Sequence, residues 1–129
     1  MFDNDLKIGE MAEDYVAEKL EEVSHLKFKK VSHVGNNYDL ESEKGTKIEV
    51  KYDKMWKKTG NIALEVGCMV YTDADYITYL LYPDVYIAKA KTVRDHINDF
   101  KIINGGDGNR TKLCLIPLTE FKKLFRKIN

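Results

Sequence analysis

The pattern of apolar and polar positions divides the chain into one long N-terminal helix followed by alternating strands and helices. Residues 5–24 contain no proline and no strand-like run, and Asn4 or Asp5 is a candidate N-cap. At about 100° per residue, the apolar positions of this segment fall on one stripe, which predicts that one face of the helix is buried. The members of this stripe are Gly9, Ala12, Val16, Leu20 and Val23.

The rest of the chain alternates short apolar runs with turn residues, which predicts a mixed α/β domain spanning residues 1–129. A hairpin is expected around Pro83, a helix with Thr92 as its N-cap, and an irregular loop at residues 104–109. The expected strands are residues 27–34, 61–66, 75–82, 85–88 and 112–117, and the expected later helices are residues 92–100 and 119–128.

A turn at residues 43–45 separates two further strands and sets their register. If these residues form a three-residue loop with Gly45 in the left-handed conformation, Ser42 pairs with Thr46. Counting back along both strands places Asp39 opposite Glu49, with both side chains on one face. A two-residue loop would turn Asp39 to the other side.

The resulting cluster is Asp39, Glu49 and Lys51, because alternate residues of a strand share a face. Two carboxylates within reach of one Mg²⁺, with an amine beside them, are the minimum equipment for metal-assisted phosphodiester hydrolysis. The alternative is a solvated hairpin face that carries an ordinary Lys–Glu ion pair.

This pattern resembles the signature of the PD-(D/E)xK nuclease superfamily, an Asp followed after a gap by Glu-x-Lys on the adjacent strand. Tyr38 stands where many members have proline. The resemblance implies a restriction-endonuclease-like core, with a mixed central β-sheet flanked by helices, an α-β-β-β opening, further strands and a C-terminal helix. The family normally has a crossover helix after the Glu-x-Lys strand, and no helical pattern is evident between Lys51 and Asp75. Either residues 92–100 take that role or the sheet is rearranged.

The resemblance also implies a larger metal shell for Mg²⁺ or Mn²⁺. In resolvase-like members a first-helix glutamate seven positions before a leucine completes the shell, and Glu13 has this spacing from Leu20. Glu13 lies at the rim of the apolar stripe, where an unpaired charge is costly. Glu10 is the alternative ligand, and a glutamate that reaches solvent is the alternative role for Glu13. The Val50 carbonyl is the expected backbone ligand.

Composition limits the class of protein. The 129 residues are 43% hydrophobic and 11% aromatic, which excludes a disordered chain and suits a single domain. No apolar run reaches transmembrane length, and the acidic N-terminus is unlike a signal peptide. Cys68 and Cys114 lack a CxxC partner, so free thiols and a cytoplasmic location are expected.

The net charge is zero, with 21 basic and 21 acidic residues, which argues against a simple DNA-coating protein. Basic and aromatic residues nevertheless gather directly after the Glu-x-Lys strand, and this combination suits phosphate contacts and base stacking. A second basic group near the C-terminus is interpreted as a solvated helix face. The first group is Lys54, Trp56, Lys57 and Lys58, and the second is Lys122, Lys123, Arg126 and Lys127.

Residues 59–66 and 72–76 resemble a phrase found in phage and bacterial nucleases, which implies that Asn61, Glu65 and Thr72 lie near the cleft. For Glu65 the favoured alternative is an exposed position on an amphipathic strand. The sequence thus predicts a Mg²⁺-dependent DNA endonuclease, and resemblance alone adds branched or junction DNA as substrate and a homodimer as the acting form. The alternatives are an inactive nucleic-acid-binding module with the same fold, or a structural α/β protein in which the motif is a coincidence.

Overall fold

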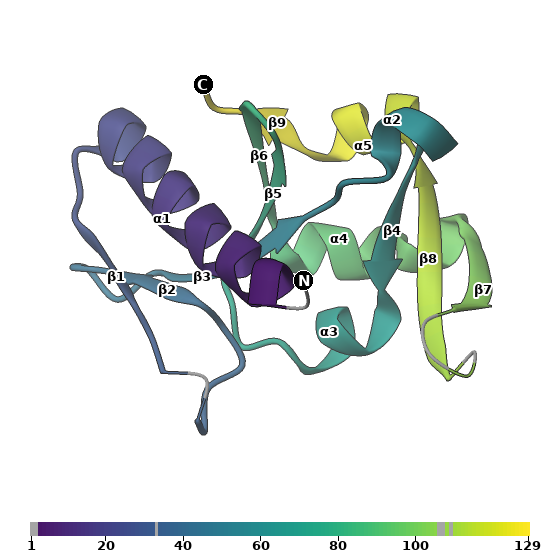
Figure 1. Ribbon diagram of the computed structural model, residues 1–129, viewed down its shortest axis with the longest axis horizontal. Coiled ribbons are helices and arrows are strands. Elements are labelled where there is room, and N and C mark those ends of the chain that lie inside the picture. The colour runs from purple at the N-terminus through teal and green to yellow at the C-terminus, as the bar shows by residue number, and fades with distance from the viewer. Residues whose placement is uncertain (1–2, 33, 106–107, 109) are drawn as a thin grey trace.

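The protein is a mixed α/β structure built on two sheets (Figure 1). The computed structural model describes residues 3–32, 34–105, 108 and 110–129. In chain order its elements are α1 (Asp3–Ser24), β1 (Phe28–Lys30), β2 (Leu40–Ser42), β3 (Lys47–Tyr52), α2 (Trp56–Thr59), β4 (Asn61–Glu65), α3 (Val66–Tyr71), β5 (Tyr76–Leu81), β6 (Asp84–Lys89), α4 (Ala90–His96), the 3₁₀-helix η1 (Ile97–Asp99), β7 (Lys101–Gly105), β8 (Thr111–Pro117), α5 (Leu118–Leu124) and β9 (Arg126–Lys127).

The larger sheet has six strands in the order β1-β2-β3-β5-β6-β9. Its first three strands form an antiparallel meander, whereas β5 pairs with β3 in parallel. A parallel neighbour requires a crossover connection, and here the chain crosses through α2, β4 and α3. The strand in this crossover, β4, is not part of the large sheet. It pairs with β8, which also pairs with β7, in a separate antiparallel sheet at the right of Figure 1.

The expectation of no helix between Lys51 and Asp75 is therefore wrong. Two helices lie in this interval, and α3 directly precedes β5. Helix α3 has six residues, and among them only Met69 is buried. So short a helix cannot show the repeated apolar spacing by which a helix is read from sequence. The alternative role for residues 92–100 as the crossover is also wrong, because α4 follows β6.

Helix α1 covers one face of the larger sheet. Its buried residues Ala12, Val16 and Leu20 pack in one cluster with Leu40 and Ile48 of the β2–β3 hairpin. The predicted stripe is correct at these helix positions and wrong at its end, where Val23 is 51% exposed. The N-cap prediction is also wrong, because Asn4 and Asp5 lie inside the helix.

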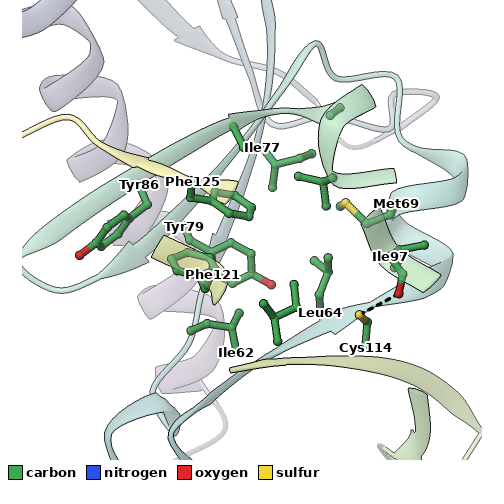
Figure 2. Close-up of a cluster of buried hydrophobic side chains, with 14 of the residues drawn as sticks. Ile62, Leu64, Met69, Ile77, Tyr79, Tyr86, Ile97, Cys114, Phe121 and Phe125 are labelled. Carbon is green, nitrogen blue, oxygen red and sulfur yellow. Dashed lines mark hydrogen bonds between the residues drawn. The ribbon is translucent and has the colours of Figure 1, made fainter. Parts of the chain in front are cut away.

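The opposite face of the sheet carries the aromatic part of the core (Figure 2). Tyr79 of β5 lies edge-on to Phe121 and Phe125, with ring centroids 5.5 Å and 5.7 Å away, and those two rings stack at 4.3 Å. Such aromatic pairs add to the free energy gained by burial alone. Helix α5 is thereby fixed against β5, one strand away from Lys51, which pairs with Tyr79 in the parallel register.

Several predicted boundaries are wrong for local reasons. Helix α4 begins at Ala90. Thr92 therefore lies inside the helix and is not its N-cap. The predicted C-terminal helix stops at Leu124, and the last residues pair with β6 as the short strand β9. The strand expected at residues 27–34 is limited to β1, and its position 33 lies outside the described residues.

The predicted loop at residues 104–109 begins inside a strand that the sequence analysis missed. Strand β7 runs to Gly105 and pairs with β8, and positions 106, 107 and 109 lie outside the described residues. The other predicted strands are found with shifts of one residue or less at most ends. Both cysteines are free, with Cys114 buried and Cys68 partly buried.

No helix in the described part of the chain is both long enough and apolar enough to cross a membrane.

Candidate active site

The β2–β3 hairpin has the predicted three-residue loop. The Ser42 N–H donates to the Thr46 carbonyl at 2.9 Å, and Gly45 has φ +86°, a left-handed conformation that favours glycine. Leu40 pairs with Ile48, as the predicted register requires, and Asp39 precedes this pair with its N–H donating to the Ile48 carbonyl. The predicted loop and the register of the hairpin up to Leu40 are confirmed.

The two faces of the hairpin have different environments. Leu40 and Ile48 point toward α1, so alternation places Asp39, Glu49 and Lys51 on the opposite face. Both carboxylates are nearly covered there, with Asp39 8% and Glu49 9% exposed. The prediction that these three side chains share one face is confirmed.

Backbone hydrogen bonds hold Asp39 between its neighbouring strands. Its N–H donates to the Ile48 carbonyl and its carbonyl accepts from the Val31 N–H, each at 2.9 Å. Its Oδ2 accepts a further hydrogen bond from the Val50 N–H at 2.8 Å. Peptide groups two residues apart in a strand point the same way, so the Val50 carbonyl points to the β2 side of β3, as the Ile48 carbonyl does. Asp39 and the Val50 carbonyl therefore lie beside each other.

Burial and charge repulsion raise the pKa of Glu49 to about 7. Loss of water contributes most, the Asp39 carboxylate adds to it, and the Lys51 ammonium opposes both. The Lys51 Nζ lies 3.4 Å from Glu49 Oε2. Its positive charge partly compensates the repulsion between the two adjacent carboxylates. A cation between Asp39 and Glu49 would relieve their repulsion.

Lys51 has a second and closer partner. Its Nζ donates to Cys68 Sγ at 2.8 Å, from β3 across to α3. Burial by itself lowers the pKa of Lys51, but the contact with Cys68 and the charge of Glu49 together raise that pKa above its ordinary value. Lys51 is therefore a positively charged side chain at neutral pH, held between a carboxylate and a thiol.

A cavity of about 250 Å³ opens onto the two carboxylates. Its walls come from the loop before β2 and from α3 with the residue that follows it. Thr72 ties these two walls together, because its Oγ1 lies 2.9 Å from the Asn37 carbonyl and 3.4 Å from Glu49 Oε1. The cavity is lined by Asn36, Asn37, Tyr38, Asp39, Glu49, Cys68, Tyr71 and Thr72.

The donor set fits a hard divalent cation. Mg²⁺ prefers oxygen ligands, keeps several waters and is commonly bound by one or two carboxylates. Asp39 and Glu49 supply carboxylate oxygens at the wall of the open cavity. Among the described residues there is no group of three or more His, Cys, Asp or Glu side chains placed to hold a metal ion.

Glu13 and Glu10 lie on α1, which packs on the sheet face opposite to Asp39 and Glu49. Glu13 is partly buried. The pKa of Lys30 is raised, first by its contact with Asp14, 2.7 Å away, and further by the charges of Glu13 and Glu10. These acids therefore lie near Lys30 of the edge strand β1. The role of Glu13 or Glu10 as a metal ligand stays a prediction.

The basic residues after β3 lie on and just before α2, away from the carboxylate cavity. Lys54, Lys57 and Lys58 are exposed, whereas Trp56 is partly buried against the aromatic core. The Lys57 Nζ lies 5.4 Å from the centroid of the Trp56 ring. Their role in nucleic-acid binding stays a prediction.

The three residues suggested by the nuclease-like phrase lie in different places. Thr72 reaches Glu49, as expected. Glu65 is exposed at the end of β4, where its charge contributes to the raised pKa of Lys51. Asn61 is at the other end of that strand, opposite Pro117 and remote from Glu49 in the topology.

Sequence reasoning missed Cys68, Asn37 and Tyr71 as parts of the cavity. Cys68 was interpreted only as a buried thiol, and its contact with Lys51 depends on the path of α3. No local pattern predicts a contact between residues 17 positions apart on a strand and on a six-residue helix. Tyr71 is exposed at the rim and had no signal of its own.

No protein-family model matches the chain, and neither does any curated protein.

Proposed function

We propose that the chain is a Mg²⁺-dependent nuclease of the PD-(D/E)xK type. One observation carries this proposal: Asp39 and Glu49 line the same cavity, and the Lys51 ammonium is 3.4 Å from Glu49. An exposed hairpin with a chance ion pair would leave these groups in solvent. Here both carboxylates are nearly covered, yet they border an open cavity.

The topology supports the same proposal. A helix, an antiparallel three-strand meander and a parallel strand reached by a crossover with a helix are what the restriction-endonuclease-like core requires. In this proposal α1, β1 to β3, α3 and β5 would correspond to those parts. The separate sheet of β4, β8 and β7 is an addition to that core.

In this mechanism Asp39, Glu49 and the Val50 carbonyl would hold the metal. Glu13, which the resemblance implies as a further ligand, is not counted in this set, because α1 packs on the opposite face of the sheet. When bound, Mg²⁺ polarises the scissile phosphate and lowers the pKa of a coordinated water. Glu49 binds the metal as a carboxylate and must lose its proton first, at a pKa near 7. Binding and proton release are therefore linked.

Lys51 is the catalytic amine. It stays charged because Glu49 and Cys68 hold its proton, and Cys68 fixes the direction of its side chain. A fixed cation next to the scissile phosphate orients the attacking water and stabilises the negative charge that develops during hydrolysis. Thr72 and Asn37 keep the wall of the cavity beside Glu49 in place.

DNA is the proposed substrate, and an endonucleolytic cut in branched or junction DNA by a homodimer follows from the resemblance. A cytoplasmic location follows from the two free thiols. The alternative is a binding module that keeps the fold without the chemistry. One observation favours this alternative: Lys51 Nζ is closer to Cys68 Sγ, at 2.8 Å, than to Glu49.

The test is a panel of supercoiled, linear, single-stranded and four-way-junction DNA, incubated with the wild-type protein and Mg²⁺ or Mn²⁺. Asp39→Asn is the matched control, because it keeps the size of the side chain and removes its charge. Metal-dependent cleavage by the wild type alone supports the proposal. If the wild type binds no metal and cuts nothing on the panel, the binding module replaces the enzyme.

A further inference from the structure

A second and larger cavity, of about 540 Å³, lies on the α1 side of the sheet. We call it the aromatic groove. It runs between the first half of α1, the end of β3, α2 and the tip of the β5–β6 hairpin. Four aromatic rings and two lysines form much of its lining, namely Tyr15, Tyr52, Trp56, Tyr82, Lys54 and Lys57.

The groove exposes apolar surface that the core does not use. Tyr82 is 69% exposed and Met11 66% exposed, both on its lining. Two of the rings are nevertheless held in place by contacts. The Tyr15 hydroxyl donates a hydrogen bond to the Pro83 carbonyl at 2.8 Å, and the ring centroids of Tyr15 and Tyr82 are 5.3 Å apart. Exposed apolar patches of this kind mark binding surfaces.

The charge at the groove favours an anionic occupant. Asp53 is an acid on the lining, and its carboxylate accepts hydrogen bonds from the Met55 N–H at 2.7 Å and the Ala63 N–H at 3.3 Å. These two backbone N–H groups partly compensate the negative charge of Asp53. Lys54 and Lys57 add positive charge beside the rings. Aromatic rings flanked by cations suit bases that stack and phosphates that are neutralised, and a duplex would hide its bases from them.

A third open cavity lies next to the groove at the end of β3. It is lined by Lys51 and Glu65, and it shares Tyr52, Asp53 and Lys54 with the aromatic groove. Lys51 in turn contacts Cys68 in the wall of the carboxylate cavity. Lys54 therefore belongs to the lining of both cavities, beside the aromatic rings of one and Lys51 of the other.

We propose that the aromatic groove binds unpaired bases of the DNA strand that enters the Asp39–Glu49–Lys51 site. This inference rests on the proposed nuclease function and narrows its substrate to DNA with a single-stranded segment beside the cut. Tyr82 and Trp56 are the stacking surfaces, and Lys54 and Lys57 contact the phosphates.

Trp56 is the single tryptophan of the chain and reports on the groove directly. Its fluorescence is titrated with oligo(dT), with the matching oligo(U) and with a blunt duplex, all in EDTA so that no cleavage occurs. We expect oligo(dT) to quench the fluorescence and to bind at least about tenfold more tightly than the duplex. Tyr82→Ala weakens oligo(dT) binding by about tenfold, the scale of losing one stacked base.

Charge is tested separately from stacking. Lys57→Gln lowers the slope of log affinity against log salt by about 0.7, the value for one contact to a single-stranded phosphate. Lys101→Gln, on exposed β7 of the other sheet, is the matched control and leaves binding and slope unchanged. Tyr82 is exposed, and a thermal melt of Tyr82→Ala unchanged from the wild type verifies that the fold is kept.

The groove and the nuclease can fail independently. Unchanged Trp56 fluorescence, wild-type affinity in Tyr82→Ala or equal affinity for the duplex overturns the groove, even if the wild type cuts DNA. Tighter binding of oligo(U) overturns the assignment to DNA. If the wild type cuts nothing but Tyr82→Ala weakens oligo(dT) binding as expected, the nuclease is overturned and the base-binding groove stands.

Discussion

The Val50 backbone N–H donates a 2.8 Å hydrogen bond to Asp39 Oδ2, joining the start of one strand to the middle of the next. Strand β2 ends its regular pairing at Leu40, so this contact continues the ladder through a side chain. It fixes one carboxylate oxygen of Asp39 against the backbone of β3. The same contact makes Asp39 suitable for a conservative substitution.

Asp39→Asn should abolish binding of Mg²⁺ and cleavage together while the protein stays folded. The asparagine amide oxygen can still accept from the Val50 N–H, but a hard cation depends on the carboxylate charge. Affinity for DNA should survive and should rise in metal-free buffer, because repulsion between the site and phosphate is reduced. Calorimetric titration with Mg²⁺ or Mn²⁺, run beside a cleavage gel, measures both effects. Metal affinity equal to that of the wild type would place the ion elsewhere.

Lys51→Ala should separate metal binding from catalysis. The substitution leaves both carboxylates in place, so the metal still binds, while the rate of cleavage falls by about a hundredfold or more, the scale of losing one stabilising donor. Removing the ammonium also removes the group that opposes the high pKa of Glu49. The pH at which metal binding is half-maximal should therefore move upward. A cleavage rate within a few fold of the wild type would remove Lys51 from the mechanism.

Cys68 positions Lys51, and two substitutions test this. Cys68→Ala removes the 2.8 Å acceptor of the Lys51 ammonium, so the rate constant for cleavage should fall by roughly tenfold with little change in metal affinity. Cys68→Ser keeps an acceptor of similar size and should retain more activity than Cys68→Ala. Single-turnover rates and metal titrations of the two variants give the comparison. Equal rates in both variants would mean that the thiol only fills space.

Local sequence was sufficient for the core of the site. Gly45 and the three positions of its loop determine the register, and the register determines that Asp39 faces Glu49. The apolar alternation of Leu40 and Ile48 determines which face is buried against α1. These relationships depend on residues close together in the chain, where period-two geometry is reliable.

The parts that sequence reasoning missed depend on long-range packing. Helix α3 is too short to give a periodic pattern, and it brings Cys68 to Lys51 only because β5 pairs in parallel with β3. Strand β9 has two residues and forms by pairing with β6, so its sequence read as the end of a helix. In both places tertiary contacts override the local preference.

Glu49→Gln should remove a pH dependence of stability in metal-free buffer. The pKa of Glu49 is about 7 in the folded protein and near 4.5 in the unfolded chain. Between these values the folded state keeps a proton that the unfolded state has lost, so the contribution of Glu49 to stability is full below about pH 4.5 and decreases as the pH rises to about 7. The wild type should therefore lose stability relative to Glu49→Gln across this window, by on the order of 3 kcal/mol.

Urea unfolding of both proteins at several pH values between 4.5 and 8, in EDTA, measures this difference directly. Taking the difference between the two proteins cancels the titration of the carboxylates that do not interact with Glu49. Glu22→Gln, an exposed glutamate on α1, is the control and should follow the wild type at every pH. Adding Mg²⁺ should restore the stability of the wild type at pH 8, because the metal binds the deprotonated carboxylate of the folded state, and should have little effect on Glu49→Gln. If the difference in stability between the wild type and Glu49→Gln instead stayed constant from pH 4.5 to 8, Glu49 would be an ordinary ion-paired carboxylate, already charged and satisfied by Lys51 without a metal.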